Sequence, residues 1–461
     1  MPVSKAKGYT IDMCNGAILP KMLVFALPLM FSTMLQLLFN AADLVVVSRF
    51  AGDNAMAAVG ANTSLTNLLV KSMSSVAVGA NVLAARERGA GERQEIHRTV
   101  HTAMAMAFAG GILLLSIGVF GADWLMQWME IPEAIADQAA LYLKIYCWGM
   151  PATLVYNFGA ALLRSVGDTK RPLYFLTLSG VVNVLLNLVL VIVFHMDVAG
   201  VAIATAASNV LSAAMVVYCL LRDEGDIRLE IRKLRIYCDK LLAILRIGLP
   251  AGIQASVFSM SNVLIQSSVN SFGEVVIAGH AAASTIQGFV HCVDHSLCST
   301  VLSFMGQNMG AKKIKRVSSV LAIAIGYQVV ASVAIVGIFA LWGEPLLRIY
   351  TDTPEVIAVG ISEFAIMVNF YFLCGCMNIL GNSVRGLGHS LTSMIISMVG
   401  VCGFRVVWIA TVFQIPQYHT YSSLMFSYPV SWLATALIFL GFWCYAIRKV
   451  KRQFAAEGII E

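Results

Sequence analysis

Three polar residues share one helical face in the first long apolar stretch of the chain. Between Lys21 and Arg49 the only ionisable side chain is Asp43, and Gln36 and Asn40 precede it. Spacings of four and three residues place all three on one side of a helix. A carboxyl group inside a membrane span is costly and usually lines a pathway, so we interpret Asp43 as a functional residue that faces a polar cavity.

The chemistry available to Asp43 is the binding and release of a cation, with the proton as the simplest case. A low-dielectric environment penalises the charged form of a carboxyl group, so a cavity that alternately wets and dries would make Asp43 lose and regain a proton. Asn183 and Asn187 lie one turn apart in a later apolar stretch and could donate hydrogen bonds to it. The alternative is that Asp43 only orients toward outer water, since Arg49 follows closely.

A second cluster, His291, Asp294 and His295, has the i, i+3, i+4 spacing of one helical face. Three such side chains could ligate a metal ion, but a closed tetrahedral site needs a fourth ligand and none is evident. We therefore predict no metal site and expect Asp294 to form an acidic floor of a cavity, with the histidines beside it.

Two basic residues within apolar stretches need partners of their own. Lys71 either pairs with an acid such as Asp43 or extends its stem toward an interface. Arg405 poses the same question in the second half of the chain. Flexible apolar side chains could form adaptable cavity walls; the candidates are Met34, Phe39 and Met260.

The elements that must position these residues are membrane helices. The 461 residues are 59% hydrophobic and 12% charged, with a mean hydropathy of +0.79, which indicates an all-α polytopic membrane protein. Runs of about 20 apolar residues cross a bilayer. Twelve are predicted, centred near residues 33, 70, 109, 150, 183, 209, 257, 290, 327, 370, 402 and 435. The ten cysteines lie mostly in these runs, which favours free thiols.

The distribution of basic residues predicts the orientation. Twelve spans place both termini on one side, and most of the 31 lysines and arginines fall on that side. The exceptions are Arg49, Lys71, Lys144, Arg348 and Arg405. The positive-inside rule therefore makes the termini cytoplasmic. Because the basic loops act as topology signals, we expect no nucleic-acid partner.

The two halves of the chain resemble each other at an offset of 220 to 222 residues. Pro28 recurs as Pro250, and Asn157 recurs as Asn378. Six spans in each half give parallel repeats, an arrangement known in transporters. The predicted domains are an N-lobe of residues 1–221, a charged cytoplasmic linker of residues 222–240, and a C-lobe of residues 241–461.

Short motifs are spread over both halves of the chain: Leu27-Pro28, Asn40-Ala-Ala-Asp43, Gly79-Ala-Asn81, Gly149-Met-Pro151, Leu163-Arg-Ser-Val-Gly-Asp168 and Gly306-Gln-Asn308. In these motifs the chain resembles the multidrug and toxic compound extrusion (MATE) family of secondary transporters over nearly its whole length. The resemblance implies a V-shaped pair of six-helix lobes around a central cavity. It also implies export of cationic or amphipathic compounds in exchange for H⁺ or Na⁺.

The resemblance further implies a cation site inside the N-lobe. Carried over by position, this site contains Asp43, Gln36, Tyr142, Asn157, Asn183 and Thr205. Many proton-linked members carry a second acid where this chain has Asn187, and the acid of the seventh helix in sodium-linked members is missing between Ser256 and Ile265. The first departure leaves one carboxylate where two might share a proton or bind Na⁺. Because the chain is closer to the proton-linked branch, we expect coupling to H⁺ rather than Na⁺.

The sequence thus predicts a monomeric antiporter in a bacterial inner membrane that exports organic cations or amphipathic drugs by alternating access. Lipids and small molecules are the expected partners, with no cofactor beyond the coupling ion and no enzymatic activity. A flippase for lipid-linked precursors is the alternative, but a pyrophosphate headgroup would need a strongly basic cavity, and only Lys71 and Arg405 qualify. An enzyme would need a catalytic cluster, and only the residues around His291 come close.

Overall fold

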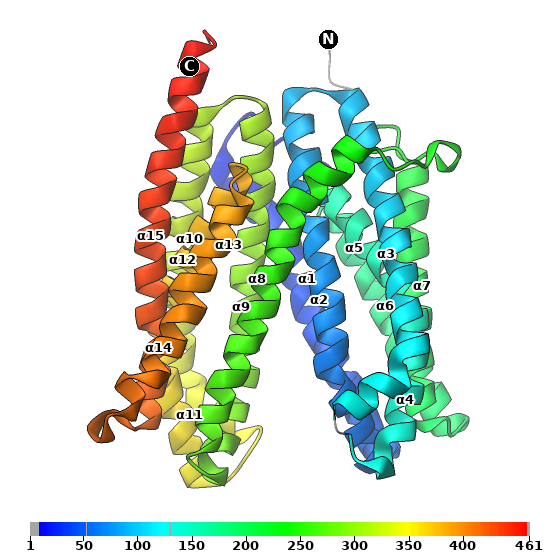
Figure 1. Ribbon diagram of the computed structural model, residues 1–461, viewed down its shortest axis with the longest axis vertical. Helices are drawn as coiled ribbons and strands as arrows, with labels where there is room; N and C mark the ends of the chain where they lie inside the picture. Colours follow the sequence, from blue (N-terminus) through cyan, green and yellow to red (C-terminus); the bar gives the residue numbers. More distant parts are fainter. Residues whose placement is uncertain (1–8, 52, 130, 459–461) are drawn as a thin grey trace. The chain divides into compact units, whose positions relative to one another are not determined.

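The computed structural model describes residues 9–51, 53–129 and 131–458, and nearly all of these residues lie in helices (Figure 1). No β-strand occurs in the described ranges. The predicted all-α class is confirmed.

The first half of the chain forms seven α-helices and one π-helical segment within the described residues. They are α1 (Ile18–Phe50), α2 (Asp53–Ala90), α3 (Arg93–Trp128), α4 (Glu133–Trp148), α5 (Met150–Ser165), α6 (Lys170–Leu188), the π segment η1 (Val189–Val193) and α7 (Asp197–Leu221). The 3₁₀ turn η2 (Ile231–Lys233) lies in the connection to the second half.

The second half repeats this pattern with different interruptions. Its elements are α8 (Cys238–Asn270), α9 (Glu274–Gly310), α10 (Ile314–Arg348), α11 (Pro354–Met367), α12 (Tyr371–Gly386), α13 (Ser390–Ser397), the π segment η3 (Met398–Gly403), α14 (Phe404–Ala410), the 3₁₀ turns η4 (Val412–Gln414) and η5 (Pro416–Tyr418), and α15 (Tyr421–Ala456).

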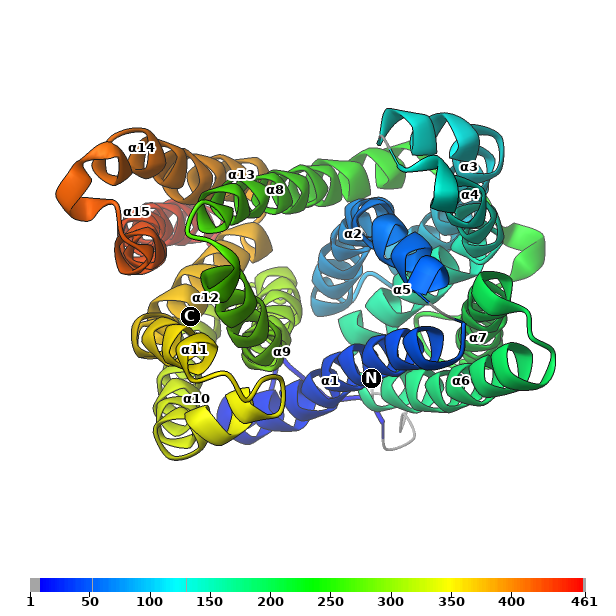
Figure 2. The same ribbon diagram turned by 90° about the horizontal axis from the view of Figure 1, so that it is seen from below.

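The chain divides into two compact units, and Figure 2 looks along the helices of each. The described part of the first unit is residues 9–12 and Leu27–Gly252, and the second unit takes Met13–Ala26 and the chain from Ile253 onward. Helices α1 and α8 therefore each contribute to both units. The linker predicted at residues 222–240 belongs to the first unit, while the predicted boundaries at 221 and 241 stay predictions.

Among the described residues, ten helices are long and apolar enough to cross a membrane, or eleven if α11 and α12 form one bent span. We expected twelve. The difference arises because the predicted spans near 150 and 370 are each broken into two shorter helices. The axes of α11 and α12 differ by 49°. Between α4 and α5 the chain passes Gly149, and Pro151, which lacks a backbone N–H, lies in the first turn of α5.

Glycines allow close contacts between helices of the first unit. A Cβ atom added at Gly159 on α5 would lie 2.8 Å from Val216 Cγ1 on α7, and one added at Gly248 on α8 would lie 2.7 Å from Val76 Cα on α2. Small residues at such contacts let backbones approach where lipid supplies no hydrophobic driving force between helices.

Ion pairs hold the charged segment of residues 222–240 against helices α2 and α3 of the first unit. Lys240 Nζ lies 2.5 Å from Glu87 Oε1 and 2.5 Å from Glu95 Oε2, and both Glu87 and Lys240 are buried. The exposed Lys233 pairs with Glu230 at 2.8 Å and lowers the pKa of that carboxyl below its usual value. The buried Lys240 pairs and the exposed Lys233 pair allow the effects of burial on the contribution of an ion pair to stability to be compared.

Replacing Lys240 by Met should lower the thermal unfolding midpoint of the purified protein strongly, because removing one partner of a buried ion pair costs about 3–5 kcal/mol. Lys233→Met is the matched control, since an exposed pair contributes only about 0–1 kcal/mol. Equal shifts in the two variants would contradict a stabilising role for the buried cluster.

Candidate functional site

Asp43 lies partly buried on α1 and is held by an amide from α6. The fully buried Asn187 donates a hydrogen bond from Nδ2 to Asp43 Oδ1 at 2.5 Å. Asn187 Nδ2 also lies 3.4 Å from Asn183 Oδ1, and Asn183 Nδ2 donates to Thr205 Oγ1 on α7 at 3.4 Å. A chain of polar contacts, here called the Asp43 chain, thus joins α1, α6 and α7 within the first unit.

A glycine explains why Asp43 and Asn187 meet. The ring of Phe39 on α1 packs directly on Gly180 of α6, where any added Cβ atom would collide with it. Phe39 precedes Asp43 by one helical turn, and Gly180 precedes Asn187 by two, so this contact brings the two polar residues opposite each other. Directly after α6 the chain forms the π segment η1, a feature often found at functional sites.

The Asp43 chain contains one carboxyl group and otherwise neutral side chains. Within the described residues, Asn187 Oδ1 is buried and accepts no hydrogen bond. An unpaired buried polar atom costs about 1–3 kcal/mol, so its retention suggests a use. Because an amide offers both a donor and an acceptor, Asn187 can bond Asp43 in its ionised and in its protonated form.

Two tyrosines of α4 lie near this carboxyl group. Tyr142 is buried and stacks on Tyr146, with ring centroids 5.8 Å apart. Both rings interact electrostatically with Asp43. Tyr142 was among the predicted residues, whereas Tyr146 was not; its position one turn later on the same face was the available signal.

The other residues predicted for the first unit do not join the Asp43 chain. Asn157 donates to Ser74 Oγ on α2 at 2.8 Å. Gln36, Asn40 and Lys71 are exposed, and Met34 is partly buried. No ion pair joins Lys71 to an acid among the residues that the structure describes. Of the two alternatives for Lys71, the structure therefore does not contain the pair with Asp43.

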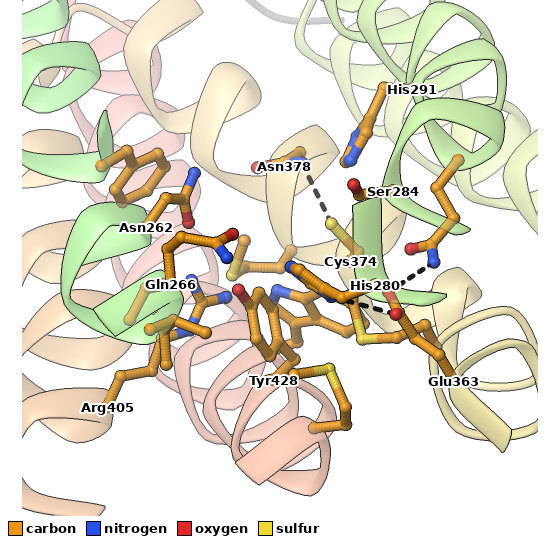
Figure 3. Close-up of a pocket in the computed structure, with 18 residues that line it drawn as sticks. Asn262, Gln266, His280, Ser284, His291, Glu363, Cys374, Asn378, Arg405 and Tyr428 are labelled. Atoms are coloured by element: carbon orange, nitrogen blue, oxygen red, sulfur yellow. Dashed lines mark hydrogen bonds and ion pairs between the residues drawn. The ribbon is translucent and has the colours of Figure 1, made fainter. Parts of the chain in front are cut away.

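The second unit contains a cavity of about 490 Å³, a size typical of small-molecule sites (Figure 3). Its walls come from α8, α9, α11, α12, η3, α14 and α15. The apolar and aromatic lining residues are Phe258, Ile265, Met367, Met377, Val401, Met425, Tyr428 and Trp432. The remaining lining residues are mostly polar and include Asn262, Gln266, His280, Gln287, His291, Glu363, Asn378 and Arg405.

Glu363 is the buried carboxylate of this cavity. Gln287 Nε2 donates to Glu363 Oε1 at 2.8 Å, and Tyr421 donates its hydroxyl proton to Glu363 Oε2 at 2.5 Å. His280 Nδ1 lies 3.0 Å from the same Oε2. Helices α9 and α15 thereby place three polar partners around one carboxyl group of α11.

Our sequence-based prediction missed Glu363. The signal was the one that identified Asp43, because Glu363 is the only charged residue between Glu355 and Arg385. It lies 221 residues after Tyr142, within the repeat offset. The internal repeat was recognised from identical residues. Because Tyr142 and Glu363 differ in type, their matching positions were not recognised.

The three residues of the predicted cluster on α9, His291, Asp294 and His295, lie in different environments. His291 lines the cavity and its Nδ1 lies 2.6 Å from the hydroxyl of Tyr371, while Asp294 is buried and accepts a hydrogen bond from Asn378 Nδ2 at 2.7 Å. His295 is exposed. Asp294 is not itself a lining residue, but it is bonded to Asn378, which lines the cavity. No group of three His, Cys, Asp or Glu side chains in the described ranges is arranged to hold a metal ion.

Arg405 lines the cavity beside the π segment η3 and is only 6% exposed. Its guanidinium carbon lies 3.9 Å from the centroid of the Tyr428 ring. Met260, another predicted wall residue, is 71% exposed on α8 and does not line this cavity.

Comparisons with known proteins agree with this organisation. The MatE family model matches the chain twice, over residues 28–189 and 250–411. The two matches begin 222 residues apart, in agreement with the internal repeat found in the sequence. Together they cover more than half of the chain.

One relative and two solved structures illustrate the similarity. The probable multidrug resistance protein YoeA of Bacillus subtilis is 25% identical over 438 residues, which is 93% of this chain and 94% of YoeA. An outward-facing multidrug resistance MATE family transporter of the MOP superfamily has a TM-score of 0.89 at 19% identity, covering 98% of this chain and 100% of that one. A MOP superfamily transporter from Pyrococcus furiosus, described as having a binding pocket of reverse polarity, has a TM-score of 0.89 at 19% identity and coverages of 97% and 100%. At these identities the structures support the fold alone.

Adding a side chain at Gly180 should destabilise the first unit. Gly180→Leu places bulk where the Phe39 ring lies, and overpacking of this kind costs about 1–3 kcal/mol. We expect a shorter half-life of the folded, detergent-solubilised protein at elevated temperature. Gly60→Leu is the control, because a Cβ atom at Gly60 meets nothing within 4 Å. A half-life for Gly180→Leu as long as that of Gly60→Leu would contradict the packing described.

Proposed function

The chain belongs to the MatE family of membrane transporters, and from this membership we propose that it is a proton-coupled antiporter that exports organic cations or amphipathic compounds. The observation that carries the proposal is the hydrogen bond from Asn187 to Asp43. It holds a lone carboxyl group among neutral partners in a membrane segment, where acids usually mark an ion or substrate path.

Export of drug-like compounds is supported by the relatives. YoeA is described as a probable multidrug resistance protein, and one solved structure of the same fold is a multidrug resistance transporter. The cavity of the second unit, with methionines and aromatic rings beside polar groups, suits ligands of varied shape. We propose that this cavity binds part of the exported compound. Met34, Lys71, Met260 and His295 do not line it and stay predicted substrate-contact residues outside it.

A proton suits the Asp43 chain better than Na⁺. A sodium site needs several oxygen atoms that turn toward the ion, whereas here Asn187 directs an N–H donor at Asp43 Oδ1. A donor in that position competes with a metal cation but is compatible with a carboxyl group that gains and loses a proton. Asn183 and Thr205 extend the chain with further neutral groups. Tyr142 lies beside the Asp43 chain. We include Gln36, Asn40 and Asn157 in the proposed site as residues that are not hydrogen-bonded to this chain.

Coupling requires that the proton and the exported compound favour different states of the transporter. The two ligands need not share a site, because each can bias the same alternating-access equilibrium from its own position. We propose that protonation of Asp43 and occupation of the second unit's cavity act in this way.

The location that goes with this function is a bacterial inner membrane, with both termini on the cytoplasmic side and the chain working as a monomer among lipids. The basic loops between spans support this orientation. The flippase alternative gains no support from the cavity, because a pyrophosphate headgroup would need several basic residues and Arg405 is the one arginine among the lining residues, which include no lysine.

Asp43→Asn should abolish export driven by a pH gradient. Asparagine keeps the size and hydrogen-bonding capacity of the side chain but cannot release a proton, so uptake of ethidium into inverted, acid-inside vesicles should fall to the level of vesicles without the protein. The measurement is ethidium fluorescence before and after collapse of the gradient with an ionophore.

Asp123→Asn is the matched control, because its side chain is 67% exposed and pairs with Lys144 on the surface. It should transport like the unmodified protein. Undiminished ethidium uptake by Asp43→Asn would remove Asp43 from the coupling mechanism, and uptake that needs a sodium gradient would replace H⁺ by Na⁺.

A further inference from the structure

Arg405 is the one arginine lining the cavity of the second unit, and it has no acidic partner there. It is only 6% exposed, and no hydrogen bond or ion pair joins its guanidinium group to any described residue. Its Nε atom is fully buried without an acceptor. A guanidinium group has five N–H donors in a fixed fork, and the face of the Tyr428 ring supplies an attraction but no acceptor in the plane of that fork.

Arg385 shows how the same unit accommodates a buried arginine that has structural partners. Its NH1 group donates to Asn382 Oδ1 at 3.0 Å and its NH2 group donates to Gln254 Oε1 at 2.7 Å. Arg385 does not line the cavity. The Nε atom is buried without an acceptor in both arginines, so they differ in their terminal NH1 and NH2 groups. The arginine whose terminal groups have no hydrogen bond among the described residues is the one that lines the cavity.

Neither carboxylate beside the cavity forms an ion pair with Arg405 among the described residues. Glu363 is bonded by Gln287, Tyr421 and His280, and Asp294 by Asn378. Neither lies within ion-pair distance of Arg405 among the described residues. In the view of Figure 3, Glu363 and Arg405 lie on opposite sides of the cavity, with Tyr428 between them. Arg405 thus has no ion-pair partner among the described residues, although the cavity lining also contains the carboxylate of Glu363.

We propose that Arg405 binds the carboxylate of an amphipathic compound in this cavity. A carboxylate matches the guanidinium fork with two parallel hydrogen bonds and adds a single negative charge, equal to the charge that it meets. The apolar body would contact Phe258, Met377, Met425 and Trp432, and the cavity of about 490 Å³ is large enough for a small aromatic molecule.

This inference rests on the proposed export function and narrows it. Among amphipathic compounds, those that carry a free carboxylate, including zwitterions with a separate cationic group, should bind better than their uncharged esters. Glu363 on the far side of the cavity is compatible with a zwitterion, whose cationic end would approach that carboxylate.

A pair of dyes that differ only in this group tests the proposal. Rhodamine 110 has a free carboxylate, and rhodamine 123 is its methyl ester. Binding of each dye to the purified full chain in lipid nanodiscs is measured by fluorescence anisotropy. We expect the unmodified protein to bind rhodamine 110 more tightly than rhodamine 123.

In Arg405→Gln, the affinity for rhodamine 110 should fall by about tenfold or more, because the charge-assisted pair is lost, while that for rhodamine 123 changes little. Arg405→Lys retains the charge without the fork and should give an intermediate preference. Arg348→Gln removes an exposed positive charge from the same unit and should leave the preference intact.

Equal binding of the two dyes by the unmodified protein, a result that needs no variant, would overturn the proposal. An unchanged preference in Arg405→Gln would overturn it as well. The dye comparison is independent of export, since gradient-driven ethidium uptake without a carboxylate preference contradicts only this inference. A carboxylate preference without gradient-driven export contradicts only the proposed function.

Discussion

A carboxyl group inside an apolar helix must find its hydrogen-bond donors within the protein, because lipid tails offer none. This constraint explains much of the internal organisation of both units. Asp43 is met by Asn187, Glu363 by Gln287 and Tyr421, and Asp294 by Asn378. In each case the donor lies on a different helix from the acid, so each bond also fixes how two helices pack.

The two repeats satisfy the same constraint with different residues. Tyr142 in the first unit stands at the repeat position of Glu363 in the second, and Asp43 has no acidic counterpart on α8. The Asp43 chain consequently contains one carboxyl group among neutral side chains. At the cavity of the second unit, Glu363 and the neighbouring Asp294 have their own donors, and Arg405 has no hydrogen bond among the described residues. From this asymmetry we propose that the coupling proton binds in the first unit and the exported compound in the second.

Patterns within single helices were predictable from the sequence. The apolar runs identified the membrane helices, the repeat offset identified the internal duplication, and the isolation of Asp43 in its stretch identified it as unusual. The proximity of Asn187 to Asp43 came from the family resemblance together with the one-turn spacing to Asn183. The structure contains that contact as a hydrogen bond.

Contacts between helices were harder to predict from the sequence. Nothing in the spacing of His291, Asp294 and His295 indicates that Asp294 turns to Asn378 while His295 is exposed. The breaks at Gly149 and between α11 and α12, and the π segments before Arg405 and after Asn187, depend on packing that a single-helix pattern does not contain. Glycine contacts such as Gly180 with Phe39 decide which faces meet, and a glycine alone does not name its partner.

The most direct test of the account is the movement of protons during export. Purified protein is reconstituted into liposomes loaded with ethidium and a pH-sensitive dye in sodium-free buffer, and external ethidium is then removed by dilution. If Asp43 exchanges a proton for the exported compound, the lumen acidifies as ethidium leaves, and it does not acidify with Asp43→Asn. A lumen whose pH stays constant while ethidium leaves, or acidification that persists in Asp43→Asn, would contradict the central claim.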